Sequence, residues 1–293
     1  MKISFLIVTR HRPEELSFTL NKLKQLIQPE IHEVLVFIDA CPETERIVSE
    51  FPWVKWYTSG VQLGASPARN KLYPYAVGEI WIGLDDDAHP LGTDFIDQVL
   101  SRFRESEKTA IIAFQEVRGM FNNDQIAIET AREGNAFYAS EFVGCGFAIR
   151  KDIYLQTNGF PIWMDIYGEE SALSLEVIDL GYDIIYDYSI MVNHRKDVVK
   201  RTLENKNYYR FEKQLVNVVK FYLVYYKQPT YLIFRAVFHN FKKYAITDFT
   251  YLRRFLKAIF ALIISLPDTL SHRNPMDDSS IKRFRSLKAP LYQ

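Results

Sequence analysis

The sequence predicts an α/β fold in which a mostly parallel central sheet is flanked by helices and followed by an α-helical carboxyl-terminal region. Short apolar runs alternate with helical patterns through the first 84 residues, which is typical of parallel strands joined by helical crossovers. From about residue 200 the pattern changes to long helical segments rich in Tyr, Phe, Lys and Arg. We therefore expect an α/β domain over residues 1–200 and a helical region over residues 201–293.

The first strand is predicted at residues 3–8, ISFLIV, because a continuous apolar run of this length is typical of a strand buried on both faces. Pro13 and the two glutamates after it then begin a helix, PEELSFTLNKLKQLI, whose leucines recur at helical spacing. The same alternation predicts the next elements: a strand at 33–38, a short helix at 42–51, a strand at 54–57, a helix at 66–78 and a strand at 79–84.

The middle of the chain is less regular than its beginning, and the sequence contains no internal repeat. A helix is predicted from Gly168 to Gly181, where the glycine ends it. The other expected segments are a strand at 109–114, a long polar stretch at 116–138, a mixed strand-like segment at 141–150 and strand-like runs that end at His194.

The formal net charge is zero, with 36 basic and 36 acidic side chains, but the two signs are unevenly placed. Residues 1–200 carry 19 basic and 30 acidic side chains, whereas residues 201–293 carry 17 and 6. The two cysteines, Cys41 and Cys145, lack metal-ligand spacing, which excludes a disulfide scaffold and a structural zinc site. The longest apolar run, 258–266, is too short to cross a bilayer, which takes about 20 residues. We therefore expect a cytoplasmic protein.

Polar side chains follow three of the predicted strands. Thr9 and Arg10 follow the first strand, Asp39 follows the second, and the aspartate triplet 85–87 follows the strand that ends at residue 84. Because ligands of parallel α/β sheets bind at the carboxyl ends of the strands, these residues mark the candidate site. Neither GxGxxG nor GxxxxGK[ST] follows the first strand, which disfavours a Rossmann dinucleotide site and a P-loop ATPase.

The aspartate triplet is the strongest single signal. Asp85 and Asp87 are two residues apart, so at the end of an extended strand they point the same way, while Asp86 points to the other side. Two neighbouring carboxylates repel each other unless a cation lies between them, and oxygen ligands suit Mg²⁺ or Mn²⁺. Such an ion commonly bridges a protein carboxylate and diphosphate oxygens. The alternative interpretation is a solvated acidic turn.

Five motifs, in this order, resemble those of glycosyltransferase family 2 over about residues 1–195, and specifically bacterial-type members with a basic helical carboxyl-terminal extension. They are FLIVTRHRPEEL, VFIDACP, GASPARNKLYPYAVGEIWIGLDDD, VGCGFAIRKDIYLQTNGF, and YGEESALSLEVIDLGYDI followed by VNH. The resemblance implies the glycosyltransferase type A (GT-A) fold of nucleotide-diphospho-sugar transferases. It also implies an inverting transfer of sugar from a nucleoside-diphosphate-sugar donor.

The resemblance implies a role for each matching residue. The residues implied to bind the donor are Thr9, Arg10, Asp39, Arg69, Asp85 and Asp86. Those implied to bind a divalent cation, Mn²⁺ or Mg²⁺, are Asp87, Asp85 and His194. The implied catalytic residues, which take the proton of the acceptor hydroxyl, are Glu170 and its neighbour Glu169.

Two positions depart from the family pattern. Glu169-Glu170 stands where Glu-Asp is common, so which glutamate acts as the base stays open. Ala40 stands where a second aspartate often follows Asp39, which weakens the assignment of a base contact to Asp39. An alternative for the two glutamates is that they only complement the helix dipole, and an alternative for His194 is a strand-end histidine with a local hydrogen bond.

The helical region holds 18 of the 43 aromatic residues as well as the excess of basic charge. Residues 211–226, 231–244 and 249–266 place aromatic and apolar side chains around helices that are interrupted by Lys and Arg. This pattern favours a position on an anionic membrane surface; the alternatives are plain packing and homo-oligomerisation, and we expect no nucleic acid partner. From Asp268 onward the sequence predicts a polar and partly loose segment.

The patterns and the resemblance together predict a metal-dependent hexosyl- or deoxyhexosyltransferase, peripheral on the inner face of the plasma membrane. That the transfer inverts is implied by the resemblance alone. Its acceptor is expected to be a hydroxyl group of a glycan or of a lipid-linked molecule in cell-surface polysaccharide synthesis. The alternatives are a non-catalytic sugar-binding protein on the same fold and a nucleotidyltransferase. The latter calls for a glycine-rich loop after the first strand, and TRHRPEEL contains no glycine. Cys145 is expected to be a small buried thiol rather than a nucleophile.

Overall fold

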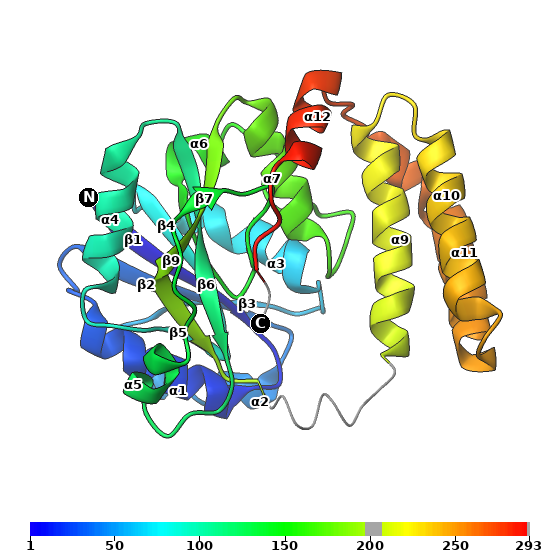
Figure 1. Ribbon diagram of the computed structural model, residues 1–293. Coiled ribbons are helices and arrows are strands. Elements are labelled where there is room, and N and C mark those ends of the chain that lie inside the picture. The colour runs from blue at the N-terminus through cyan, green and yellow to red at the C-terminus, as the bar shows by residue number, and fades with distance from the viewer. Residues whose placement is uncertain (197–206, 292–293) are drawn as a thin grey trace.

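A computed structural model describes residues 1–196 and 207–291 of the chain (Figure 1). In this part of the chain a single mixed sheet has the strand order β3-β2-β1-β4-β8-β6-β9-β5, with β7 paired to β9. The strands are β1 (Ile3–Thr9), β2 (His32–Asp39), β3 (Lys55–Ser59), β4 (Ile80–Asp85), β5 (Ala88–Pro90), β6 (Thr109–Arg118), β7 (Phe137–Tyr138), β8 (Gly146–Arg150) and β9 (Asp183–His194).

Helices cover the sheet and then form the carboxyl-terminal region (Figure 1). Those of the α/β domain are α1 (Pro13–Leu26), α2 (Pro42–Glu45), η1 (Val48–Glu50), α3 (Ala65–Leu72), η2 (Tyr73–Tyr75), α4 (Phe95–Glu105), α5 (Asp124–Glu129), α6 (Lys151–Tyr154) and α7 (Glu169–Asp179). Those that follow are α9 (Tyr208–Tyr225), α10 (Thr230–Asn240), the π-helical turn η3 (Phe241–Ala245), α11 (Phe249–Ser271) and α12 (Asp278–Ser286).

The predicted fold class is confirmed, but the sheet is mixed, because three of its described strands, β5, β7 and β8, run antiparallel to their neighbours. β1 pairs in parallel with β2 and with β4, and β6 pairs in parallel with β9. β8 runs antiparallel between β4 and β6 and so joins the two parallel parts. Because β1, β2 and β4 run the same way, Thr9, Asp39 and Asp85 come to one edge of the sheet.

The core lies on both faces of the sheet, as the continuous apolar strands predict. Alternate residues of β1 enter different clusters, because successive side chains of a strand point to opposite faces. Phe5 and Ile7 pack with apolar residues of α1 and α4, whereas Leu6 packs on the side of α3 and α7. The edge of the sheet that carries the polar residues is therefore held between two packed layers.

β9 brings the end of its strand to the aspartate turn. Its register against β6 shifts between Phe114 and Gln115, so the two strands continue side by side beyond the irregularity. At the far end His194 lies opposite Arg118 of β6 and opposite Ala88 of β5. Since β5 begins one residue after Asp87, this pairing fixes His194 beside the aspartate turn.

The predicted helical character of the carboxyl-terminal region is confirmed. α9 packs on the α/β domain through a cluster in which Phe221, Val224 and Tyr225 meet Trp163 and Leu175. α10 and α11 pack against the other side of α9, so that these helices stand beside the domain. α12 lies next to α7 at the top of the domain in the view of Figure 1. The outer faces of α10 and α11 remain exposed.

The prediction of a loose segment from Asp268 is wrong. α11 continues through Pro267 to Ser271, although Pro267 has no backbone N–H to donate, and the hydroxyl of Thr269 donates to the Ser265 carbonyl. α12 then returns to the α/β domain, where Arg283 pairs with Asp183. Long-range contacts of this kind leave no local sequence pattern, which explains the error.

Three further predictions about single elements need correction. The helix predicted at 42–51 is split into α2 and η1, and the one predicted at 66–78 ends at Leu72 and continues only as the 3-10 turn η2. The polar stretch at 116–138 contains the end of β6, the helix α5 and the short strand β7. The prediction also omits α4, although its five buried apolar residues recur at helical spacing.

Among the described residues, no helix has the length and apolar character that a membrane-spanning segment requires.

Candidate active site

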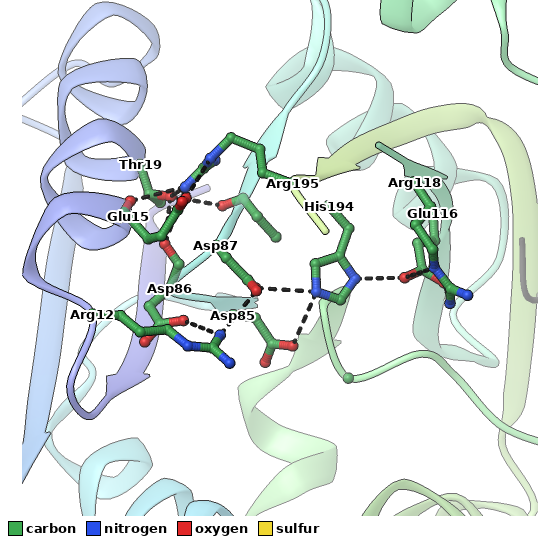
Figure 2. Close-up of polar contacts among 12 residues, drawn as sticks. Arg12, Glu15, Thr19, Asp85, Asp86, Asp87, Glu116, Arg118, His194 and Arg195 are labelled. Carbon is green, nitrogen blue, oxygen red and sulfur yellow. Dashed lines mark hydrogen bonds and ion pairs between the residues drawn. The ribbon is translucent and has the colours of Figure 1, made fainter. Parts of the chain in front are cut away.

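The aspartate turn lies between β4 and β5 and divides its carboxylates between two sides (Figure 2). Asp85 and Asp87 face His194, whose Nε2 lies 3.9 Å from Asp85 Oδ2 and 3.0 Å from Asp87 Oδ1. Asp86 faces the other way and accepts hydrogen bonds from Thr9 Oγ1 at 2.8 Å and from Arg12 at 3.0 Å. The alternation expected for residues i and i+2 therefore holds through the turn.

Arg12 lies between the two sides of the turn, because the same guanidinium nitrogen that reaches Asp86 also lies 2.8 Å from Asp87 Oδ2. Burial raises the pKa of Asp86 to about 6, although the charge of Arg12 opposes this shift. Burial also disfavours an ionised Asp87, but the contact with His194 and the charge of Arg12 outweigh it and lower the pKa of Asp87. Asp87 is thus the more strongly acidic of the two.

His194 is held from behind by a buried carboxylate of β6. Glu116 Oε1 lies 2.5 Å from Nδ1 of His194, and Arg118 in turn pairs with Glu116 Oε2 at 2.6 Å (Figure 2). Burial opposes protonation of the ring, but Cys145, Asp87 and Glu116 around it raise the pKa of His194. A cation bound between His194 and the aspartates would take the place of the proton on Nε2. The contact with Glu116 keeps a proton on Nδ1 and leaves Nε2 directed at the aspartates.

The residues on this side of the turn fit a divalent cation. Asp85, Asp87 and His194 each offer a ligand atom, and these atoms all lie within 4.8 Å of one another. Asp87 Oδ1 and His194 Nε2 are buried and lack an aligned hydrogen-bond partner within the described residues, although they lie 3.0 Å apart. Two carboxylate oxygens and one imidazole nitrogen, backed by a carboxylate, form a donor set that Mn²⁺ and Mg²⁺ accept.

Arg69 connects the aspartate turn to the first turn of α7. Its side chain is buried, and its guanidinium lies 2.8 Å from Asp85 and 3.3 Å from Glu169 Oε1. It also donates to the carbonyl of Gly144 at 3.3 Å. The neighbouring carboxylates raise the pKa of Arg69 despite its burial, so its guanidinium group stays positively charged.

The two glutamates of α7 point to different surroundings. Glu169 is buried beside Arg69, whereas Glu170 lines a cavity of about 680 Å³ between the α/β domain and α9. Glu170 lies so close to Gly144 that a Cβ added at Gly144 would clash with its carboxylate. Burial, followed by the charge of Glu169, raises the pKa of Glu170 to about 8. Only Glu170 of the pair is therefore placed to meet a molecule in this cavity.

The remaining predicted donor-binding residues lie apart from the cluster around His194. Asp39 is buried at the end of β2, and its two oxygens accept from the backbone N–H groups of Leu63 and Gly64 at 2.7 and 2.9 Å. It therefore shapes the loop before α3. Arg10 is half-buried, and its Nε has no hydrogen-bond partner among the described residues.

The sequence matches the glycosyl transferase family 2 profile over residues 4–157, which is more than half of the chain. The chain belongs to this family. A search of curated protein sequences found no significant match.

Solved structures agree with the family in fold. A mannosyltransferase from Pyrobaculum calidifontis, in complex with GDP-Man and Mn²⁺, is 13% identical with a TM-score of 0.56; the match covers 97% of this chain and 79% of that one. TarS of S. aureus, residues 1–349, is 13% identical with a TM-score of 0.57, covering 98% and 92%. GalNAc-T7 with UDP, GalNAc and Mn²⁺ is 14% identical with a TM-score of 0.60, covering 99% of this chain but 55% of that one. This member of family 2 is thus a glycosyltransferase with the GT-A fold.

Sequence reasoning missed three residues that shape the site of this glycosyltransferase. Arg12 contacts two aspartates, and Glu116 supports His194, as described above. Arg195 donates to Thr19 Oγ1 at 2.8 Å and to the Asp86 carbonyl at 3.3 Å, which fixes the backbone of the turn (Figure 2). Arg12 lies in the motif FLIVTRHRPEEL, so its place near the site could have been predicted from the sequence. Glu116 is 78 residues from His194, and no local pattern connects the two.

Proposed function

We propose that this glycosyltransferase moves a hexosyl or deoxyhexosyl group, with inversion, from a nucleoside-diphosphate-sugar donor to a hydroxyl group of a glycan or lipid-linked acceptor. The observation that carries the proposal is the chain of contacts from the Asp85–Asp87–His194 cluster through Arg69 to Glu169, which is followed directly in α7 by Glu170. It joins a site for a cation to a candidate base within one edge of the sheet. The division into a catalytic domain, residues 1–200, and a helical region, residues 201–293, is part of the proposal.

Asp87, Asp85 and His194 would hold the divalent cation, Mn²⁺ or Mg²⁺. Such an ion, when bound, stabilises the negative charge of the departing diphosphate. The placement of Asp87 between His194 and Arg12, which keeps it ionised, supports its role as the principal ligand. The two solved complexes with Mn²⁺ described above support an ion of this class.

Thr9, Arg10, Asp39, Arg69, Asp85 and Asp86 are proposed to line the donor site. Thr9 and Asp86 are hydrogen-bonded to each other, and Asp39 accepts hydrogen bonds from the loop that follows β3. These groups therefore give the proposed donor site a fixed shape. Arg10 places a positively charged guanidinium group at the same edge of the sheet. Pre-arranged polar groups of this kind bind a nucleotide without further ordering.

Glu170 is proposed as the general base, with Glu169 as a neighbour that sets its pKa. The acceptor oxygen forms a bond to the anomeric carbon while the bond from that carbon to the diphosphate oxygen breaks. The bonding pair leaves with the nucleoside diphosphate, and the hydroxyl proton passes to Glu170. Exposure of Glu170, rather than Glu169, to the cavity supports this assignment.

The helical region is proposed to rest on the anionic inner face of the plasma membrane, where the enzyme would serve cell-surface polysaccharide synthesis. Large apolar side chains are exposed along α10 and α11, among them Phe234 and Phe260 at 66% and 64%. The basic residues Arg235, Lys242 and Arg253 are exposed on the same helices and in η3. Exposed aromatic rings with basic side chains around them are typical of surfaces that bind anionic lipids. Association of two copies through this face is the alternative that a mass measurement tests.

The experiment is a donor screen by mass spectrometry with the purified chain and Mn²⁺. We expect slow hydrolysis of one nucleotide sugar, and its loss in Asp87→Ala and in excess chelator. Asp97→Asn, which removes an exposed carboxylate of α4 far from the turn in sequence, is the matched control and should retain turnover. Turnover that survives both Asp87→Ala and the chelator refutes the proposed metal site, and binding of free glycan without nucleotide would indicate a sugar-binding protein.

A further inference from the structure

The cavity beside Glu170 is built by both parts of the chain. On one side lie the loop that contains Glu141 and Gly144 and the first turn of α7. On the other side lie α9, which contributes Arg210 and Tyr222, and the end of α12 with the segment after it, which contributes Arg285. A volume of about 680 Å³ is within the range of small-molecule binding sites.

Arg210 and Arg285 are the basic residues of the helical region that line this cavity. Lys213, Arg254 and Arg283 pair with carboxylates. Within residues 1–196 and 207–291, by contrast, neither Arg210 nor Arg285 has an ion-pair partner, and both are exposed at the cavity. The cavity therefore presents two guanidinium groups that form no ion pair with its described walls.

The two guanidinium groups are also held in place by aromatic rings. Arg210 lies over the ring of Tyr167 and Arg285 over the ring of Tyr226, each 5.2 Å from the ring centroid. A stacked guanidinium keeps its N–H edges available for oxyanions, and Arg binds phosphate and carboxylate through two parallel hydrogen bonds. The charge and the geometry together fit an anion.

The rest of the wall suits a sugar. Phe221, Tyr222 and Phe284 present aromatic carbon, while Glu170 presents oxygen acceptors. Apolar ring faces pack against the C–H faces of a pyranose or a polyol, and carboxylates accept from its hydroxyl groups. The α/β domain thus contributes the carboxylate of Glu170 to the cavity, and the helical region contributes Arg210 and Arg285.

We propose that this cavity binds an acidic acceptor glycan, whose phosphate or carboxylate group is held by Arg210 and Arg285 while its acceptor hydroxyl lies at Glu170. The inference rests on the proposed function, because it places the acceptor of that reaction. It assigns acceptor selection to the helical region and separates it from donor binding at the aspartate turn.

The test uses the full chain with its donor and three series of oligosaccharide acceptors of equal length: neutral, carboxylate-bearing and phosphate-bearing. We expect acidic acceptors to be preferred, and Arg210→Gln and Arg285→Gln to raise their KM by about tenfold each, the loss of one charge-assisted contact. The kcat for these acceptors and the hydrolysis of donor without acceptor should stay unchanged. The carboxylate and phosphate series show which acid the site takes.

Arg104→Gln, which removes an exposed arginine of α4 that does not line the cavity, is the matched control and should leave every KM unchanged. Because both cavity arginines are exposed, their variants are expected to fold, and unchanged donor hydrolysis verifies this. Equal use of neutral and acidic acceptors, or an unchanged KM in the double variant, overturns the inference while the proposed function stands. Absence of any donor turnover in the unaltered chain overturns both.

Discussion

The pH profile of transfer should report the ionisation of Glu170 and its dependence on Glu169. A general base must be deprotonated to accept the hydroxyl proton, and burial together with the charge of Glu169 raises the pKa of Glu170 to about 8. The acceptor kcat/KM is therefore expected to rise with pH through about pH 8 and to level off above it. At pH 7 about a tenth of the molecules would carry an ionised Glu170.

Glu169→Gln tests the cause of this shift. It removes the neighbouring negative charge but keeps an amide oxygen that can accept from Arg69. Less repulsion lowers the pKa of Glu170, so the midpoint of the profile should move to lower pH. The shift is expected to be partial, since burial is the larger cause and remains. The rate at pH 7 can then rise by at most about tenfold, the factor by which protonation limits it.

The assay is acceptor kcat/KM measured from about pH 6 to about pH 9.5 for the unaltered chain, Glu169→Gln and Glu170→Gln. Glu170→Gln should abolish transfer at every pH while donor binding remains, and Asp97→Asn should reproduce the unaltered profile. A rate that falls as pH rises through 8, or a midpoint that Glu169→Gln leaves in place, would refute the assignment of Glu170 as a base tuned by its neighbour.

Glu116→Gln should weaken Mn²⁺ binding by about 10- to 100-fold, because His194 loses the carboxylate that orients it. Titration with free Mn²⁺ in the absence of donor measures this affinity, and an unchanged affinity would contradict the role of Glu116. Gly144→Ala should lower kcat by about 100-fold and spare donor binding, because its Cβ displaces Glu170, whereas Gly60→Ala has open space and should change neither. Phe234→Ser and Phe260→Ser should each reduce co-sedimentation with anionic vesicles by roughly tenfold, unlike Val61→Ser and Met120→Ser at equally exposed positions of the α/β domain. Vesicle binding that survives the two Phe substitutions, or that is absent in the unaltered chain, contradicts the membrane proposal.

The parts of the fold that follow from local patterns were predictable from the sequence. β1, α1, β2 and β4 were found because apolar runs and leucine spacing act within one element. The same local geometry placed Asp85 and Asp87 on one side of the turn and Asp86 on the other. Parallel pairing then brought Thr9 and Asp85 to one edge without any knowledge of side-chain contacts.

The parts that depend on distant contacts were not predictable. Glu116 supports His194 only because a register shift lets β6 and β9 continue side by side. The polar sequence of α12 predicts a loose segment, because it gives no sign of the contact between Arg283 and Asp183 that holds the helix on the α/β domain. Which glutamate faces a cavity could not be settled either, since Glu169 and Glu170 are adjacent and only Arg69, from α3, distinguishes them.

The return of the chain after α12 has a consequence for the order in which the enzyme becomes functional during synthesis. Lys288 pairs with the loop before Gly144, its carbonyl accepting from the Ser140 backbone N–H at 2.8 Å, and residues 284–289 supply one wall of the cavity at Glu170. A ribosome adds these residues after the aspartate turn, Arg69 and α7 are complete. A nascent or clipped chain that ends before them would therefore retain the groups proposed to bind the donor but lack part of the proposed acceptor cavity, and we expect it to hydrolyse the donor rather than transfer the sugar.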